Sequence, residues 1–194
     1  MKKYLFFLLT LAMNVGFAQS WTKNFTTVDE FYCGLAKAEK DNKVGFVDAK
    51  GKIVVPLIYN DAMPFSEGMA AVKSGTKWGY IDSTGQVVVP IQYCDAYSFQ
   101  EGLAKVERKG FVGFVNHKGD EVISLKFTNA GVFSGGLAPV CNEKSLWGFI
   151  DKSGTAVISF KYLYANAFHE GIARVMKDGK WMEIDQTGKV IREE

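Results

Sequence analysis

Residues 65–85 read FSEGMAAVKSGTKWGYIDSTG, and variants of this stretch recur along almost the whole chain. Each copy opens with a phenylalanine, and successive copies start 34, 34, 34 and 35 residues apart. The opening residues are Phe31, Phe65, Phe99, Phe133 and Phe168. A fixed period of this size is typical of tandem-repeat proteins, in which neighbouring units cover one another. The pattern therefore predicts an array of five units and favours a binding surface over a single catalytic cleft.

Each unit contains three predicted strands. The first, such as LAKV at 103–106, alternates small apolar with charged residues, which is typical of a half-buried strand. The second, such as WGYID at 78–82, holds a glycine that we interpret as making room for a large ring of a neighbouring unit. The third, such as VVV at 87–89, is apolar at successive positions, which indicates burial on both faces. In the last unit Met182 replaces the glycine, as expected of a terminal cap.

A tight turn with the pattern Asx-x-x-Gly joins the second and third strands of every unit. Its first residues are Asp48, Asp82, Asn116, Asp151 and Asp185. An Asx side chain can accept a hydrogen bond from the N–H two residues on, while glycine takes the left-handed position that closes the hairpin. Asn116 keeps the acceptor oxygen but lacks the charge, so the pattern favours turn capping over cation binding.

The fold is therefore predicted to be all-β, with five three-stranded β-hairpin repeats forming an open twisted β-solenoid. Propeller blades typically have four strands in about 40 residues or more, which disfavours the alternative of a closed five-bladed propeller-like ring. The segment 19–30 resembles the end of a repeat, and it would cap an open array or complete the last unit of a ring. The predicted repeats are residues 31–64, 65–98, 99–132, 133–167 and 168–194.

Residues 1–18 are predicted to be a signal peptide. Lys2 and Lys3 precede an apolar run at 4–17, and cleavage after Ala18 would leave Gln19 as the first residue. The run is shorter than the roughly 20 apolar residues of a membrane span. The processed chain is therefore expected to be exported to the periplasm, the cell surface or the medium, and not to be an integral membrane protein.

The net charge argues against nucleic-acid binding, and the cysteine positions argue against a repeating disulfide framework. The chain has 23 Lys and Arg against 21 Asp and Glu, and the predicted signal peptide contains two of the lysines, so the processed chain is formally neutral. Nucleic-acid binding requires clustered cations. The sequence shows no such cluster, so no nucleic-acid partner is expected. Cys33, Cys94 and Cys141 occupy three different repeat positions, so we expect small buried thiols, with one disulfide as the alternative.

The sequences KWGYID at 77–82 and LWGFID at 146–151 resemble the bacterial WG (KWG) repeat family. The flanking FSEGMA at 65–70 and FQEGLA at 99–104 are similar to it too, and the resemblance covers about residues 25–192. The family is all-β and often secreted, with no agreed activity and no shared catalytic residues. The resemblance thus implies a β-repeat fold with an adhesive or scaffolding role.

No residue set points to an enzyme, a metal site or a cofactor. His117 and His169 stand at repeat positions that hold other residues in the other units, so both are expected to be exposed turn residues. Glu67 and Glu101 are expected to be solvated turn acids, as is Glu170. One acid in each Asx turn is far below the six to eight oxygen ligands that calcium takes.

The aromatic residues supply the one candidate binding surface. Its members are Trp78, Tyr80, Trp147, Phe149 and Trp181, and the competing interpretation is that they pack between units. The predicted function is an exported, non-enzymatic module that binds a protein or another envelope component as a scaffold. The alternative is glycan or cell-wall binding through the Trp and Tyr faces.

Overall fold

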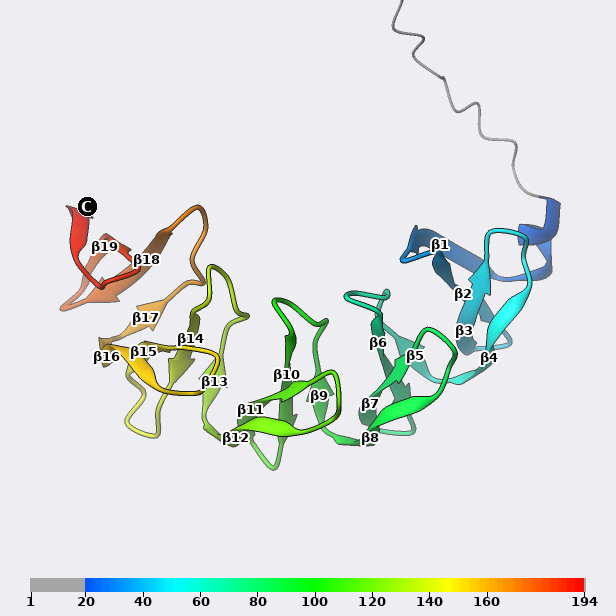
Figure 1. Ribbon diagram of the computed structural model, residues 1–194, viewed down its shortest axis with the longest axis horizontal. Coiled ribbons are helices and arrows are strands. Elements are labelled where there is room, and N and C mark those ends of the chain that lie inside the picture. The colour runs from blue at the N-terminus through cyan, green and yellow to red at the C-terminus, as the bar shows by residue number, and fades with distance from the viewer. Residues whose placement is uncertain (1–19, 194) are drawn as a thin grey trace, which may run out of the picture.

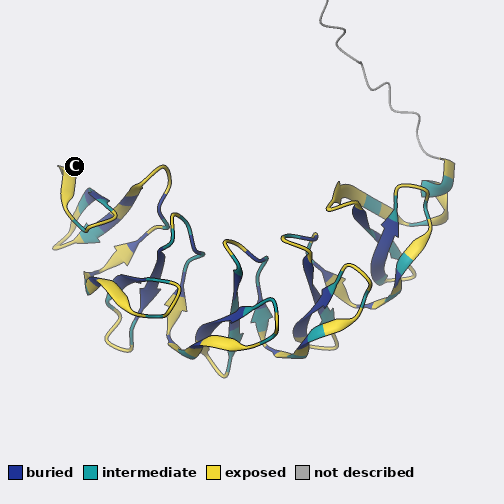
Figure 2. Ribbon diagram, viewed as in Figure 1, coloured by how far each residue is buried: buried dark blue, intermediate teal, exposed yellow. Residues whose placement is uncertain are grey.

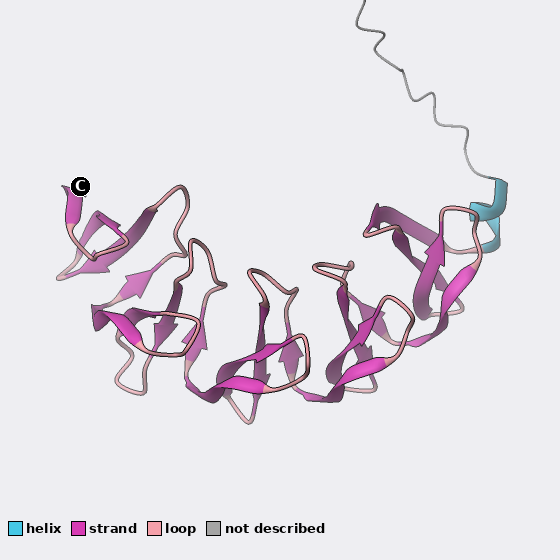
Figure 3. Cartoon of the chain, viewed as in Figure 1, coloured by secondary structure: helices cyan, strands magenta, loops and turns pink. Residues whose placement is uncertain are grey.

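The computed structural model describes residues 20–193, which form five antiparallel sheets of four strands each (Figure 1). The predicted signal peptide lies outside the described residues. Within each sheet the strands follow chain order. A short 3-10 helix, η1 (Ser20–Asn24), precedes the first sheet, and strands and turns make up the rest of the described chain (Figure 3). Within residues 20–193, no helix has the length and apolar character needed to cross a membrane.

Each sheet contains one strand of each of four kinds. The first strands are β1 (Thr27–Tyr32), β5 (Asp61–Ala62), β9 (Asp95–Ala96), β13 (Asn129–Ala130) and β17 (Tyr164–Ala165). The second strands are β2 (Leu35–Lys40), β6 (Met69–Ser74), β10 (Leu103–Arg108), β14 (Ala138–Cys141) and β18 (Ile172–Lys177). The third strands are β3 (Lys43–Asp48), β7 (Lys77–Asp82), β11 (Phe111–Asn116), β15 (Trp147–Ile150) and β19 (Lys180–Asp185). The fourth strands are β4 (Ile53–Tyr59), β8 (Val87–Tyr93), β12 (Glu121–Phe127), β16 (Ala156–Tyr162) and β20 (Val190–Glu193).

The prediction of three strands per unit was wrong by one strand. The additional strand is the first of each sheet, which in the second to fifth sheets is only two residues long. In the second sheet it pairs through Asp61 with Lys73 and through Ala62 with Val72. Two residues are too few to show an alternating pattern, so the periodicity of the sequence does not reveal them. Because of this strand, each sheet starts a few residues before the opening phenylalanine of its repeat.

The hydrophobic cores lie between successive sheets, which stand side by side along an arc in chain order (Figure 1). At the first junction, Phe46 and Val55 of the first sheet pack with Ala70 and Ile81 of the second. Equivalent clusters occupy the other three junctions. Figure 2 shows that the inner strands are buried, whereas the fourth strands carry exposed positions. Each unit thus covers a face of its neighbour, as expected. The prediction that the apolar run is buried on both faces was wrong, because in the run at 87–89 only Val89 is fully buried and Val87 is 45% exposed.

A pair of aromatic rings forms the centre of every junction. A ring on the third strand of one sheet contacts the opening phenylalanine of the next repeat, with centroids 4.6–5.1 Å apart. The pairs are Phe46–Phe65, Tyr80–Phe99, Phe114–Phe133 and Phe149–Phe168. Their mostly edge-to-face geometry is the one that aromatic quadrupoles favour. The persistence of the opening phenylalanine along the sequence therefore has a packing cause.

The glycine that recurs in the third strands has a different cause from the one predicted. A Cβ on Gly79 would lie 2.6 Å from the carbonyl oxygen of Val89 and 2.8 Å from the Cα of Ile91. The neighbour is therefore the backbone of the fourth strand of the same sheet, which bulges at this point, and not an aromatic ring of another unit. In the fifth sheet Met182 lies directly opposite Glu193, without that bulge, so a side chain fits.

Both ends of the array differ from its interior. At the start, Trp21, Phe25 and Val28 cover the buried face of the first sheet, and the ring of Trp21 lies against Gly51. At the other end, Glu183 stands where the other sheets have their junction aromatic, and it forms an ion pair of 2.6 Å with Arg192. The last sheet thus has an ion pair at the position where the other sheets have the aromatic ring of a junction.

The Asx turns have the predicted geometry in all five sheets. In each turn the Oδ1 atom accepts hydrogen bonds from the backbone N–H groups two and four residues on, at 2.8–3.0 Å. The turn glycines have φ between 80° and 89°. Asn116 makes the same two bonds as the aspartates. The role of this position is therefore turn capping.

Candidate functional site

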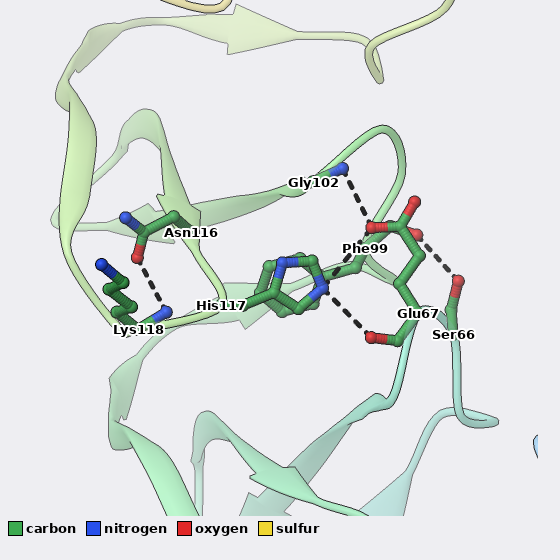
Figure 4. A network of polar contacts seen from close by, with 7 residues as sticks. All are labelled: Ser66, Glu67, Phe99, Gly102, Asn116, His117 and Lys118. Atoms are coloured by element: carbon green, nitrogen blue, oxygen red, sulfur yellow. Dashed lines mark hydrogen bonds and ion pairs between the residues drawn. The ribbon is translucent and has the colours of Figure 1, made fainter.

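Contacts between turns connect neighbouring sheets along one edge of the array. In Figure 4, Nε2 of His117 lies 3.1 Å from the carbonyl oxygen of Glu67 and 3.5 Å from its carboxylate. The imidazole stacks on Phe99 with centroids 4.3 Å apart. The Glu67 carboxylate also accepts a hydrogen bond of 2.9 Å from the backbone of Gly102. His117 and Glu67, predicted as independent exposed turn residues, therefore link the second sheet to the third.

The same arrangement recurs at the next two junctions. Glu101 accepts hydrogen bonds from the backbone N–H groups of Gly135 and Gly136, at 2.7 and 2.9 Å, and lies 3.3 Å from Nζ of Lys152. Gln186 donates a hydrogen bond of 2.8 Å to the carbonyl oxygen of Gly135. Lys152 and Gln186 occupy the repeat position of His117. These contacts add polar cross-links to the apolar junctions, so we assign them an architectural role.

The described chain does not bring its histidines and cysteines together. His117 belongs to the third sheet and His169 precedes the second strand of the fifth. Cys141 is a buried free thiol as predicted, but Cys33 and Cys94 are exposed, because their positions lie at turns outside the junction cores. Across residues 20–193, no group of three His, Cys, Asp or Glu side chains has the arrangement of a metal site.

Stability is expected to fall in acid because of the Asx turns. The Thr84 and Thr187 hydroxyls hold the pKa of Asp82 and Asp185 below the ordinary value, and backbone N–H groups in the same turns lower it further. A carboxyl whose pKa is lower in the folded state stabilises the fold above its unfolded pKa, about 3.9. The free energy of unfolding, measured by urea denaturation, should therefore decline as the pH falls below about 4.

The third sheet supplies the control for this prediction. Asn116 caps its turn without a titratable group, so Asp82→Asn should keep the turn while reducing the decline in acid. An Asp82→Asn chain that loses stability below pH 4 as steeply as the unchanged chain would contradict the assignment.

The structure separates the five aromatic residues that the sequence suggested as a surface. Tyr80 and Phe149 are fully buried in the cores of two different junctions, and Trp78 is buried in the same core as Tyr80. The Tyr80 hydroxyl donates a hydrogen bond of 2.7 Å to the carbonyl oxygen of Tyr97, and burial raises the pKa of Tyr80. These three rings cannot present a stacking face to a ligand. Trp147 and Trp181 remain partly exposed.

Trp147 and Trp181 belong to an aromatic patch at the junction of the fourth and fifth sheets. Tyr164 lies between them, with centroid distances of 5.8 Å to Trp147 and 5.7 Å to Trp181. The guanidinium of Arg174 sits over the Trp181 ring at 4.8 Å. Leu163 and Tyr164 are 53% and 44% exposed. We refer to Trp147, Leu163, Tyr164, Arg174 and Trp181 as the aromatic patch.

The aromatic patch exists because one junction departs from the repeat. The pair Leu163–Tyr164 replaces a polar or small pair that occurs at the same place in the preceding units. Those pairs are Asn60–Asp61, Cys94–Asp95 and Thr128–Asn129. There the Asx side chain accepts a hydrogen bond from the N–H of the following alanine, at 2.8–3.0 Å. Tyr164 was missed from the sequence, although its substitution for a repeated Asx was the signal that could have identified it.

Comparison with solved structures shows the fold. Hsv2 from Kluyveromyces lactis is similar with a TM-score of 0.53 and 13% identity, over 86% of this chain and 63% of that one. BamB from Moraxella catarrhalis is similar with a TM-score of 0.50 and 10% identity, also over 86% and 63%. The chain thus spans less than two thirds of either protein. No curated protein matches the chain in sequence.

The sequence profile of the WG-containing repeat matches four consecutive segments. They are residues 45–78, 78–110, 113–144 and 147–181. Each segment runs from the third strand of one sheet to the hairpin or third strand of the next, so the four matches correspond to the four junctions between the five sheets. The matches cover well over half of the chain, and the chain therefore belongs to the family of WG-containing repeat proteins.

Proposed function

We propose that this chain is a non-enzymatic binding or scaffold module that holds a protein partner on its aromatic patch. The observation that supports the proposal is the exposure of Leu163 and Tyr164 at a position where preceding units have polar or small residues. A solvent-exposed pair of this kind adds nothing to the turn that an Asx residue would not supply. Clustered exposed apolar side chains instead favour an interaction site.

The composition and geometry of the aromatic patch favour a protein partner over a glycan. Trp, Tyr and Arg are the residues most enriched among those that dominate protein–protein binding energy. The ring of Tyr164 is inclined by 48° to Trp147 and by 73° to Trp181. Rings at such angles do not share a plane on which successive sugar rings could stack. They form an uneven surface that suits an inserted side chain.

Glycan or cell-wall binding is the alternative, and the partial exposure of Trp147 and Trp181 is the observation in its favour. Titration with soluble glycans separates the two functions. A glycan that shifts Trp fluorescence, with the shift abolished in Trp147→Ala and Trp181→Ala, would establish the alternative.

We also propose that the array stays open as a twisted solenoid and does not close into a ring. The Glu183–Arg192 pair occupies the position of the junction aromatic in the last sheet, and Trp21 and Phe25 cover the first sheet with their own side chains. The last sheet therefore lacks the ring that would meet an opening phenylalanine, and the face of the first sheet that would receive it is already covered. An open array offers its edges and fourth strands to partners along its whole length.

The place of action is proposed to be the bacterial envelope or the medium. The support is the signal-like sequence of residues 1–18, with basic Lys2 and Lys3 before an apolar run. Mass spectrometry of the protein from fractionated cells should find a chain beginning at Gln19 outside the cytoplasm. A full-length chain in the cytoplasm would contradict export.

Tyr164→Asp tests the role of the aromatic patch with minimal risk to the fold. Aspartate occupies this position in the second and third sheets and caps the following alanine there. We therefore expect the free energy of unfolding to fall by only about 1–2 kcal/mol, because two ring contacts are lost while the turn keeps its cap. Capture of a partner from an envelope extract should weaken about tenfold or more.

The matched control is Val122→Asp, which places the same charge on an exposed residue of the third sheet, away from the aromatic patch. Proteins retained by the unchanged chain and by Val122→Asp, but not by Tyr164→Asp, are the expected partners. If Tyr164→Asp retains the same proteins in the same amounts, the aromatic patch is not the binding surface.

A further inference from the structure

Two grooves occupy equivalent places in the array. One lies at the junction of the third and fourth sheets and has a volume of about 490 Å³. The other lies where the N-terminal segment meets the first sheet and has a volume of about 560 Å³. The two grooves are lined mostly at the same repeat positions. Phe127 in the first groove corresponds to Phe25 in the second, and Phe160 in the first corresponds to Leu57 in the second. Both volumes are in the range of small-molecule sites.

Both grooves occur where the repeat has phenylalanine in place of tyrosine. The equivalent residues elsewhere are Tyr59, Tyr93 and Tyr162. The hydroxyl of Tyr93 donates a hydrogen bond of 3.1 Å to Glu121, and Arg108 donates one of 2.9 Å to the same carboxylate. By repeat position, Arg108 and Glu121 correspond to the groove-lining residues Lys40 and Ile53. At the junction of the second and third sheets, hydrogen-bonded polar groups thus stand at the positions of these groove-lining residues.

The linings of the two grooves share a chemistry. Each has an apolar floor, made by Phe127 and Phe160 in one case and by Phe25 and Leu57 in the other. Each rim contains two lysines and one acid. These are Lys126, Lys144 and Glu143 in the first groove, and Lys40, Lys43 and Asp41 in the second. The ammonium of Lys126 lies 5.4 Å from the centre of the Phe127 ring, directly beside the floor. The excess of positive charge at an apolar floor is complementary to an apolar anion.

We propose that both grooves bind a small apolar carboxylate, whose body rests on the phenylalanine and whose carboxylate pairs with the rim lysines. This binding is separate from the protein partner of the aromatic patch. It would give the array two ligand positions, both at units that have phenylalanine where three others have tyrosine.

The test uses 4-phenylbutyrate as the probe on the purified, isotopically labelled chain. Backbone amide shifts in an NMR titration should change at both grooves, with dissociation constants on the order of 1 mM, as expected for a ligand of this size. The uncharged analogue 4-phenylbutyramide should bind about two- to fivefold more weakly, because it cannot pair with exposed lysines. Equal binding of both probes, or no shifts in either groove, would overturn the proposal.

Variants that introduce the residue found at the same position of another unit test each groove separately. Phe127→Tyr introduces the residue of three other units, and Ala156→Glu introduces the residue that the third sheet has as Glu121. Each should weaken binding at the third junction about tenfold or more while the groove at Phe25 keeps its affinity. Phe25→Tyr should have the reverse effect. Thermal unfolding of each variant shows whether the fold is retained. Folded variants that lose both sites together, or neither, would contradict two independent grooves.

Discussion

Phe133→Ala is expected to destabilise the array by about 3–5 kcal/mol in urea denaturation. Phe133 is 2% exposed, and its ring contacts Phe114 across the junction of the third and fourth sheets, with centroids 4.9 Å apart. Truncation removes the centre of that core and leaves a cavity between two sheets that, in the described chain, no backbone–backbone hydrogen bond joins. Because units in such arrays are stabilised by their neighbours, the loss should uncouple the last two sheets from the first three.

Phe31→Ala is the matched control for that prediction. Phe31 opens the first repeat at the same position as Phe133, but it is 41% exposed because, within residues 20–193, no sheet stands before the first one. The same substitution should there cost about 1 kcal/mol or less. Equal losses in the two variants would show that the cost arises within a sheet and not at a junction.

Gly79→Ala is expected to destabilise the chain by about 3 kcal/mol, at the upper end of what overpacking usually costs. The added Cβ would lie 2.6 Å from the carbonyl oxygen of Val89, and the atoms around it are mostly backbone. A side chain could rotate away, but the bulged β8 can only move by breaking its pairing with β7. Thermal and urea unfolding of the variant measure the effect.

Gly68→Ala separates steric overlap from backbone strain. Gly68 has a φ of 80°, and a Cβ there would meet no atom within 4 Å. Alanine at this position should lower the free energy of unfolding only by the strain of the left-handed conformation, about 1–2 kcal/mol. If Gly79→Ala costs no more than Gly68→Ala, the close approach of the fourth strand is not what requires the glycine.

Much of the local structure follows from short stretches of sequence. The Asx turns were predictable because Asp48 and its equivalents bond only to their own turn, so no distant residue is needed. The long second, third and fourth strands were predictable from alternation and apolar runs. The two-residue strand Asp61–Ala62 was not, since its only sign is its pairing with Val72 and Lys73 on the neighbouring strand.

In the candidate site, too, the sequence predicts some features and only the packing of the sheets decides others. Trp147 and Trp181 stand out in the sequence, but so do Trp78 and Tyr80, which are buried. Residue type does not tell an exposed ring from a buried one, because exposure depends on what the next sheet places over it. Tyr164 completes the aromatic patch only because it lies between two rings from other strands.

The period of 34 residues, its strands and its turns are properties that the chain encodes locally, through hydrogen bonds and side-chain patterns within one unit. The identity of the neighbour that each side chain meets is a property of stacked sheets. Contacts across a junction decide that His117 reaches Glu67, and that Leu163 and Tyr164 stay uncovered. Their partners come from different sheets, and only the arrangement of those sheets in space brings them into contact.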